Sequence, residues 1–194
     1  MKLAIFDFDD TLIHLDISWA DVKKDVITLS AKKGIKEDPA EHLIPMSNRL
    51  SLDPDMKKAI DAIFLRYEGK CITSKKYTIF SEMMSLVKDL KGKGFLLAIV
   101  SGNLTSSIKA ILSRAGMTGY FDVICGRDIL SKNKPNPDQI LFVLDNLKVS
   151  KKEALYAGDS VFDELTAKAA GVGFVKVAHG DGIAISEIRK AFGL

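Results

Sequence analysis

Short apolar runs alternate with longer amphipathic stretches along most of the chain. Five runs predict buried strands, at residues 3–6, 95–100, 121–125, 154–157 and 174–177. The stretches between them repeat apolar residues every three or four positions and predict helices over 81–91, 105–114, 137–147, 161–170 and 183–192. Strands and helices that alternate at this spacing form a parallel sheet with helices on both faces. The pattern therefore predicts a doubly wound, Rossmann-like α/β fold with a five-stranded parallel sheet.

Residues 14–76 interrupt this alternation and carry only helical patterns. Apolar residues recur at helical spacing over 19–33, and an Asp-Pro pair, which is a helix-start signal, occurs at Asp38 and again at Asp53. We expect Pro45 to kink the helix after Asp38, and Gly69 to end the helix after Asp53. The predicted organisation is a core of residues 1–13 and 77–194, with residues 14–76 as a small all-helical insert after the first strand.

Three carboxylates follow the first predicted strand within four positions: Asp7, Asp9 and Asp10. Like charges this close resist joint ionisation, and a divalent cation would relieve the repulsion. A set of oxygen ligands without sulfur suits Mg²⁺. The alternative is a solvated acidic turn after an edge strand. Asp10 has two possible roles: it could strengthen metal binding by the loop, or it could simply face the solvent.

Three further polar stretches lie at or near the ends of predicted elements. They are Ser-Gly-Asn at 101–103, Lys-Pro-Asn-Pro at 134–137 and Gly-Asp-Ser-Val-Phe-Asp at 158–163. Ligands of parallel sheets bind at the carboxyl ends of strands, where the strand order reverses. We therefore expect these stretches to meet the three carboxylates at one site.

The Asp-x-Asp-x-Thr pattern at 7–11 and these three stretches, in this order, resemble the four motifs of the haloacid dehalogenase-like superfamily, most of whose members are phosphatases. The resemblance covers nearly the whole chain except residues 14–76. The place of the helical insert and the composition of 158–163 resemble the phosphoglycolate phosphatase-like branch, in which such an insert is a cap. The resemblance implies the strand order 5-4-1-2-3, with the strands that precede Asp7 and Asp159 side by side.

The resemblance also implies roles for the acidic residues. Asp7 would be the nucleophile that forms an aspartyl-phosphate, and Asp9 the general acid and base. Half-protonation of Asp9 at neutral pH would require its pKa to rise by about three units from about 3.9. Mg²⁺ would be held by Asp7, Asp159 and Asp9, the last through its backbone carbonyl. Asp163 would orient metal-bound water or the lysine at 134.

The remaining motif residues are candidates for holding the phosphate group. Hydroxyl and backbone N–H groups could cradle the phosphate oxygens at Thr11, Ser101, Gly102 and Asn103. A Ser-Gly-Asn stretch would also fit a plain turn. Lys134 is the candidate cation that holds the phosphate. Lys132 is the alternative, but the family's Lys-Pro-x-Pro pattern matches Lys134.

Composition and charge narrow the class of partner. The chain has 28 Lys and Arg against 25 Asp and Glu, a net charge of +3, and no basic block that would suggest nucleic acid. The longest apolar run, at 95–100, is too short to cross a membrane, and Asp7 interrupts the apolar start too early for a signal peptide. Cys71 and Cys125 are isolated, which favours reduced, buried thiols in a cytoplasmic protein over a disulfide.

These observations favour a Mg²⁺-dependent phosphomonoester hydrolase, as a monomer or dimer, that acts on a compact, phosphoglycolate-like metabolite. Dehalogenases and phosphonatases of the superfamily lack an acid at the position of Asp9, so its presence favours phosphate-ester chemistry. A sugar phosphomutase of the same superfamily is the first alternative, because it uses the same aspartyl-phosphate. A non-catalytic phosphate-binding protein is the second.

Overall fold

The computed structural model describes residues 1–178 and 182–194. Within these residues, one parallel sheet has the order β5-β4-β1-β6-β7. Its strands are β1 (Leu3–Phe6), β4 (Leu96–Val100), β5 (Val123–Cys125), β6 (Ala154–Gly158) and β7 (Gly173–Lys176). Numbered along the core alone, this is the order 5-4-1-2-3, as expected. The strands that precede Asp7 and Asp159 are neighbours, with Phe6 opposite Ala157.

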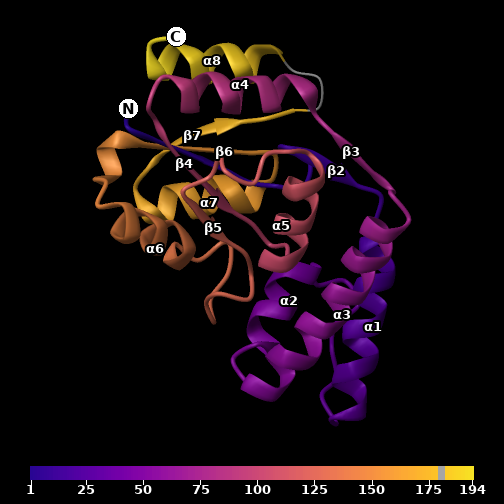
Figure 1. Cartoon of the computed structure of the whole chain (residues 1–194). Helices are drawn as coiled ribbons and strands as arrows, with labels where there is room; N and C mark the ends of the chain where they lie inside the picture. The colour runs from indigo at the N-terminus through magenta and orange to yellow at the C-terminus, as the bar shows by residue number, and fades with distance from the viewer. Residues whose placement is uncertain (179–181) are drawn as a thin grey trace.

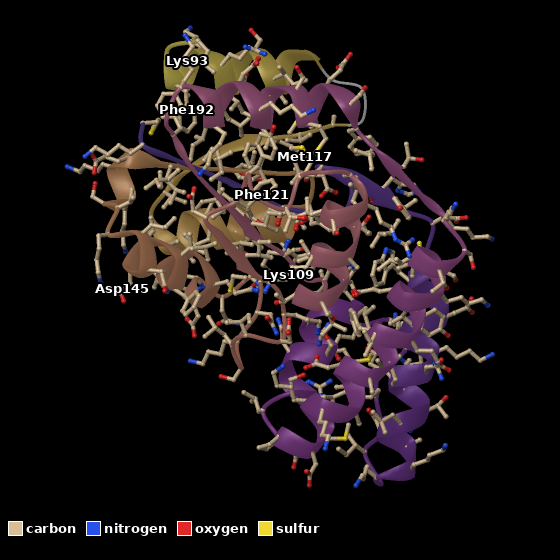
Figure 2. The ribbon with its side chains drawn as sticks, in the orientation of Figure 1. Lys93, Lys109, Met117, Phe121, Asp145 and Phe192 are labelled. Atoms are coloured by element: carbon tan, nitrogen blue, oxygen red, sulfur yellow. The ribbon has the colours of Figure 1, made fainter. Side chains whose placement is uncertain are left out.

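Helices cover both faces of the sheet because the strands are apolar on both sides. One face packs against α4 (Ser81–Gly92), α5 (Thr105–Arg114) and α8 (Gly182–Phe192), and the other against α6 (Asp138–Leu147) and α7 (Val161–Ala170). Figure 1 shows α4 and α8 side by side on one side of the sheet. Phe192 of α8 meets Phe95 edge to face at 4.9 Å, whereas Asp145 of α6 points outward (Figure 2). The predicted doubly wound fold is confirmed.

Residues 19–73 are mainly helical and form an apolar cluster of their own, which also includes Leu104. The helices are α1 (Trp19–Lys32), α2 (Leu43–Leu50) and α3 (Pro54–Thr73), which form a group at one end of the molecule (Figure 1). Val22, Met46 and Ile60, one from each helix, are completely buried in this group. We call residues 14–76 the cap from here on.

A small antiparallel ribbon joins the cap to the core. It pairs β2 (Ile13–Leu15) with β3 (Tyr77–Ile79), and Ile13 lies opposite Ile79. The expectation that residues 14–76 carry only helical patterns is therefore wrong at residues 14 and 15, which belong to β2. Strands of three residues with a polar residue at the centre carry too little periodicity to be recognised, and this ribbon depends on its partner strand 60 or so residues away.

Three details of the cap also differ from expectation. Asp38 starts a turn, in which its side chain accepts from the Ala40 N–H at 2.8 Å, and α2 begins only at Leu43 with His42 as its N-cap. Pro45 lies in the first turn of α2, where no N–H is required, so it causes no kink there. Gly69 lies inside α3, which continues to Thr73 because apolar residues beyond Gly69 still face the core. The second Asp-Pro signal is confirmed, since Asp53 caps α3 through the Met56 N–H at 2.8 Å.

Two further expectations concern the whole chain. Cys71 and Cys125 are both buried and free, as predicted. Within the part of the chain that the structure describes, no helix combines the length and apolar character that a membrane crossing requires. The short 3₁₀ helix Lys151–Glu153 completes the described elements.

Candidate active site

The four motif stretches meet at the carboxyl ends of β1, β4 and β6. Asp7 directly follows β1, and its N–H donates to the Ala157 carbonyl of β6 at 2.8 Å. Lys134 reaches this point from the loop before α6: its Nζ lies 2.9 Å from Asp7 Oδ1 and 2.6 Å from Asp163 Oδ1. Parallel strands end at the same edge of the sheet, so residues far apart in the chain converge here.

An acidic cluster at this edge has the donor chemistry of a magnesium site. Carboxylate oxygens of Asp7, Asp159 and Asp163 lie within 4.8 Å of one another. Asp7 Oδ1 is buried and has no aligned hydrogen bond within the described residues, although the Lys134 ammonium is close to it. Three carboxylates this close repel one another, a cation between them would relieve that repulsion, and oxygen-only ligands suit Mg²⁺. The residues present therefore fit the metal that the sequence suggests.

Burial and charge set the protonation of this cluster. Burial, together with the charge of Asp163, raises the pKa of Asp7 to about 7. Burial alone would raise the pKa of Asp163. The charge and hydrogen bond of Lys134 act in the opposite direction and hold this pKa below its ordinary value. The pKa of Lys134 lies above its usual range, because the two carboxylates outweigh the effect of burial. The pair Lys134–Asp163 is thus charged, and Asp7, which shares the same ammonium, is the acid whose pKa rises to about 7.

The loop after Asp7 positions the second candidate acid. Asp9 Oδ1 accepts from the Leu15 N–H at 2.7 Å, so the start of the cap connection holds this carboxyl. Burial raises the pKa of Asp9 to about 7, which is the shift that half-protonation at neutral pH requires. Asp10 adopts a left-handed backbone with φ of 57° and contacts His14 Nδ1 at 2.6 Å. The sequence does not indicate this contact, and His14 also groups with Asp9 and Asp10 as a cluster of metal-ligating types.

Thr11 differs from the other predicted phosphate-binding residues in its surroundings. Its buried hydroxyl lies 3.4 Å from Asp159 Oδ1 and donates toward that carboxylate. Thr11 lines a neighbouring cavity of about 260 Å³, whereas Ser101, Gly102 and Asn103 line the larger cavity over the site. A contact between Thr11 and substrate stays a prediction, and the hydroxyl is placed to orient Asp159.

The loop after β4 is held by a residue of the cap. The Ser101 hydroxyl donates to Asn103 Oδ1 at 2.9 Å, and Asn103 Nδ2 donates to Glu68 Oε1 at 3.1 Å. Glu68 also accepts from the Leu104 N–H at 3.2 Å. Glu68 is completely buried in α3, and burial raises its pKa to about 7. Sequence reasoning missed Glu68, although it occupies the buried stripe of α3 four residues after Phe64, where an acid is unexpected.

Two side chains hold the backbone of Lys134. The Gln139 side chain accepts from the Lys134 N–H at 3.3 Å and donates to the Ser101 carbonyl at 3.2 Å, which links two motif loops. Asn48 of α2 donates to the Lys134 carbonyl at 2.7 Å. Lys132, the alternative cation, is exposed. The structure thus brings Lys134, and not Lys132, to the acidic cluster.

Because Gly158 has no side chain, the Asp163 side chain of the same motif, residues 158–163, can pack directly against its backbone. A Cβ at this position would lie 2.6 Å from both Cβ and Cγ of Asp163, which are not the mobile end of a long side chain. We expect Gly158→Ala to lower the free energy of unfolding by about 1–3 kcal/mol, because Asp163 must move away from Lys134. Urea unfolding measures this change. Gly69→Ala is the matched control, since nothing lies within 4 Å there and alanine favours a helix; equal stability of the two variants would contradict the prediction.

A cavity of about 450 Å³ lies over the site, between the core and the cap. The core contributes motif residues, among them Asp7, Asp9, Ser101, Lys134 and Asp159. The cap contributes mainly apolar and aromatic groups with a few polar ones, among them Trp19, Lys23, His42, Leu43, Asn48 and Phe64. Cavities of this size hold small molecules. The arrangement can enclose a phosphate group at its core end and the rest of a substrate against the cap.

Comparison with known proteins agrees with the motifs. The family model of haloacid dehalogenase-like hydrolases matches residues 4–177. Phosphoglycolate phosphatase of Aquifex aeolicus is 31% identical over 185 residues, covering 88% of this chain and 82% of that protein. A protein of Caldanaerobacter subterraneus with the provisional name pyrophosphatase PpaX is 32% identical over 186 residues, covering 91% and 82%.

A solved structure from Lactobacillus plantarum, provisionally described as a phosphoglycolate phosphatase, superposes with a TM-score of 0.68. The superposition covers 98% of this chain and 99% of that one, at 23% sequence identity, so it bears on the fold alone. The family model spans both the Asp7 strand and the Asp159 strand and includes the cap between them. The chain therefore belongs to the haloacid dehalogenase-like hydrolase family.

Proposed function

We propose that this protein is a Mg²⁺-dependent phosphomonoester hydrolase that acts through an aspartyl-phosphate on a compact phosphorylated metabolite. The observation that carries the proposal is the position of Asp7, which is a buried carboxylate at the end of β1, beside the Lys134 ammonium at 2.9 Å. Asp7, Asp159 and the backbone carbonyl of Asp9 would hold Mg²⁺. The ion, when bound, would neutralise charge on the phosphate group and favour the ionised form of Asp7.

In the first step, a carboxylate oxygen of Asp7 attacks phosphorus and the bond from phosphorus to the ester oxygen breaks. The leaving oxygen takes the proton of Asp9, whose pKa of about 7 makes the protonated form available at neutral pH. Lys134 stabilises the charge that develops on the phosphate oxygens. The products are an aspartyl-phosphate and a free alcohol.

In the second step, Asp9 accepts a proton from water, and the water oxygen forms a bond to phosphorus. The bond between phosphorus and Asp7 breaks, which releases inorganic phosphate and regenerates the Asp7 carboxylate and the protonated form of Asp9. Ser101, Gly102 and Asn103 would hold the phosphate oxygens during both steps. Asp163 would keep Lys134 in place, as their 2.6 Å contact suggests.

The cap, residues 14–76, would limit access of water and select the alcohol. Several contacts join it to the motif loops: Asn48 to the Lys134 carbonyl, Glu68 to Asn103, and the His42 ring to Phe162 at 4.8 Å. These contacts support a closed arrangement in which substrate is enclosed between the cap and the core made of residues 1–13 and 77–194. Phosphoglycolate is the first compound to try, because the Aquifex aeolicus relative is named for it.

The test is release of inorganic phosphate from a panel of phosphate esters, with Mg²⁺ and with EDTA. We expect turnover of small phosphorylated acids, and its loss in EDTA with recovery when Mg²⁺ is restored. Isomerisation of sugar phosphates that outruns phosphate release would favour a phosphomutase. Binding of phosphate esters without turnover of any of them would favour a non-catalytic binding protein.

A further inference from the structure

Arg127 is a buried cation in the cavity wall that the proposed chemistry does not use. Its exposed fraction is 4%, and it lines the cavity together with Phe64 and Asn103. Its Nε donates to Asp61 Oδ1 at 2.9 Å, and its guanidinium lies 3.7 Å from the centre of the Phe64 ring. Within the described residues, its Nη2 is buried without any hydrogen-bond partner. A buried N–H that lacks an acceptor costs free energy, and an acceptor that enters the cavity would recover it.

Gly126 explains why the backbone of Arg127 lies so close to the loop that contains Asn103. A Cβ at Gly126 would lie 2.5 Å from the Thr105 nitrogen and 2.6 Å from the Asn103 carbonyl oxygen. Without a side chain there, the loop approaches so closely that the Arg127 N–H donates to the Asn103 carbonyl at 2.9 Å. Arg127 is thereby attached to the loop that is proposed to hold the phosphate.

Each of the acids near Arg127 accepts hydrogen bonds from other groups, and Arg127 Nη2 has no acceptor among the described residues. Asp61 is shared, because Lys57 Nζ donates to its other oxygen at 2.6 Å, so two cations face one carboxylate. The remaining acids nearby have other donors. Asp128 accepts from the Thr105 N–H and hydroxyl at 2.8 Å, and Glu68 accepts from Asn103 and Leu104.

A second buried polar group in the same wall lacks partners. Asn133 lines the cavity with an exposed fraction of 5%, and in the described part of the chain neither Oδ1 nor Nδ2 of its side chain has a hydrogen bond. Arg127 and Asn133 thus offer unused N–H donors to one cavity. Two buried donors without acceptors are the pattern that a substrate with oxygen atoms would complete.

We propose that Arg127, assisted by Asn133, binds a carboxylate on the alcohol portion of the substrate and so selects phosphorylated acids. The proposal rests on the phosphohydrolase function above and adds the specificity residue. A carboxylate has two oxygens and can accept from Arg127 Nη2 and from an amide N–H at the same time, while Asp61 stays bound to Arg127 Nε. Arg127 is a binding residue here, and the reaction at phosphorus does not involve it.

The experiment compares each ω-carboxyalkyl phosphate, with two to five carbons, with its neutral primary amide. The amide has the same size but lacks the charge. We expect the wild type to prefer the carboxylate at one chain length by about tenfold or more in kcat/KM, as a charged hydrogen bond provides. Arg127→Met should bring this ratio close to one, through a larger loss of kcat/KM for the carboxylate than for the amide.

Three further variants separate recognition from folding. Arg127→Lys keeps the charge beside Asp61 and should give an intermediate ratio, because the second guanidinium nitrogen is lost. Asn133→Ala removes a side chain without hydrogen bonds within the described residues, so it should fold normally and lower kcat/KM for the carboxylate more than for the amide. Lys58→Met is the matched control: Lys58 is an exposed cation of the same helix and is not part of the cavity lining, so the ratio should persist.

The outcomes distinguish the two proposals. If the wild type hydrolyses no ester, the phosphohydrolase function fails, and the role of Arg127 fails with it. If the wild type hydrolyses carboxylates and amides equally at every length, or if Arg127→Met and Arg127→Lys both keep the wild-type ratio, the Arg127 proposal alone is wrong.

Discussion

Asp7→Asn is expected to abolish phosphate release, with a loss on the order of 10³-fold or more in kcat, as for removal of a nucleophile. The amide is neutral and a poor nucleophile toward phosphorus, and it is also a weaker ligand for Mg²⁺. The variant should remain folded. Asp7 is the acid of the cluster whose pKa burial raises to about 7, so a neutral side chain of the same shape suits its surroundings. Lys134 keeps its contact with Asp163 at 2.6 Å.

Para-nitrophenyl phosphate hydrolysis with Mg²⁺ measures the activity, and circular dichroism during heating measures the fold. Asp16→Asn is the matched control, because Asp16 is an exposed acid of the same segment with a long ion pair to Lys76 at 3.9 Å. We expect this control to retain wild-type activity. Turnover by Asp7→Asn above about a tenth of the wild-type rate would rule out the aspartyl-phosphate mechanism.

Lys134→Met is expected to lower kcat by about 100-fold or more, because a preorganised cation is lost from the phosphate site. It is also expected to destabilise the protein by about 3–5 kcal/mol, since removing one partner leaves buried charge uncompensated. Lys134 is 5% exposed and is the cation that contacts both Asp7 and Asp163. The kinetic assay is therefore run at a temperature at which urea unfolding shows the variant to be folded.

Lys132→Met provides the comparison within the same loop. Lys132 is exposed, so its loss should change neither kcat nor the urea midpoint appreciably. A larger kinetic effect at Lys132 than at Lys134 would mean that the cation of the site had been assigned to the wrong lysine. Saturation with Mg²⁺ in both assays keeps the metal from limiting the rate.

The parallel sheet could be predicted because its strands are apolar on both faces. In β1, Leu3 and Ile5 pack against one layer of helices, while Ala4 and Phe6 pack against the other. Such runs are short and continuous and therefore recognisable. The β2–β3 ribbon could not be predicted in this way, because its three-residue strands depend on each other across the whole cap.

The convergence of Asp7, Lys134 and Asp159 could be predicted for a related reason. Each follows or precedes a recognisable element, and the carboxyl ends of parallel strands meet at one edge. Local sequence therefore determined which chemical groups gather there. It also indicated that Asp9 would require a raised pKa, and burial supplies that shift, to about 7.

Only the tertiary structure decided what surrounds those groups. Glu68 reaches Asn103 across 35 positions, Arg127 reaches Asp61 across 66, and Asn48 reaches the Lys134 carbonyl across 86. No strand-end rule places these partners, because each pairing depends on how the cap helices rest on the core. The sequence alone thus determined the sheet and the reacting groups, whose positions follow from local periodicity and strand direction. The shape and polarity of the cavity were decided by packing between segments far apart in the chain.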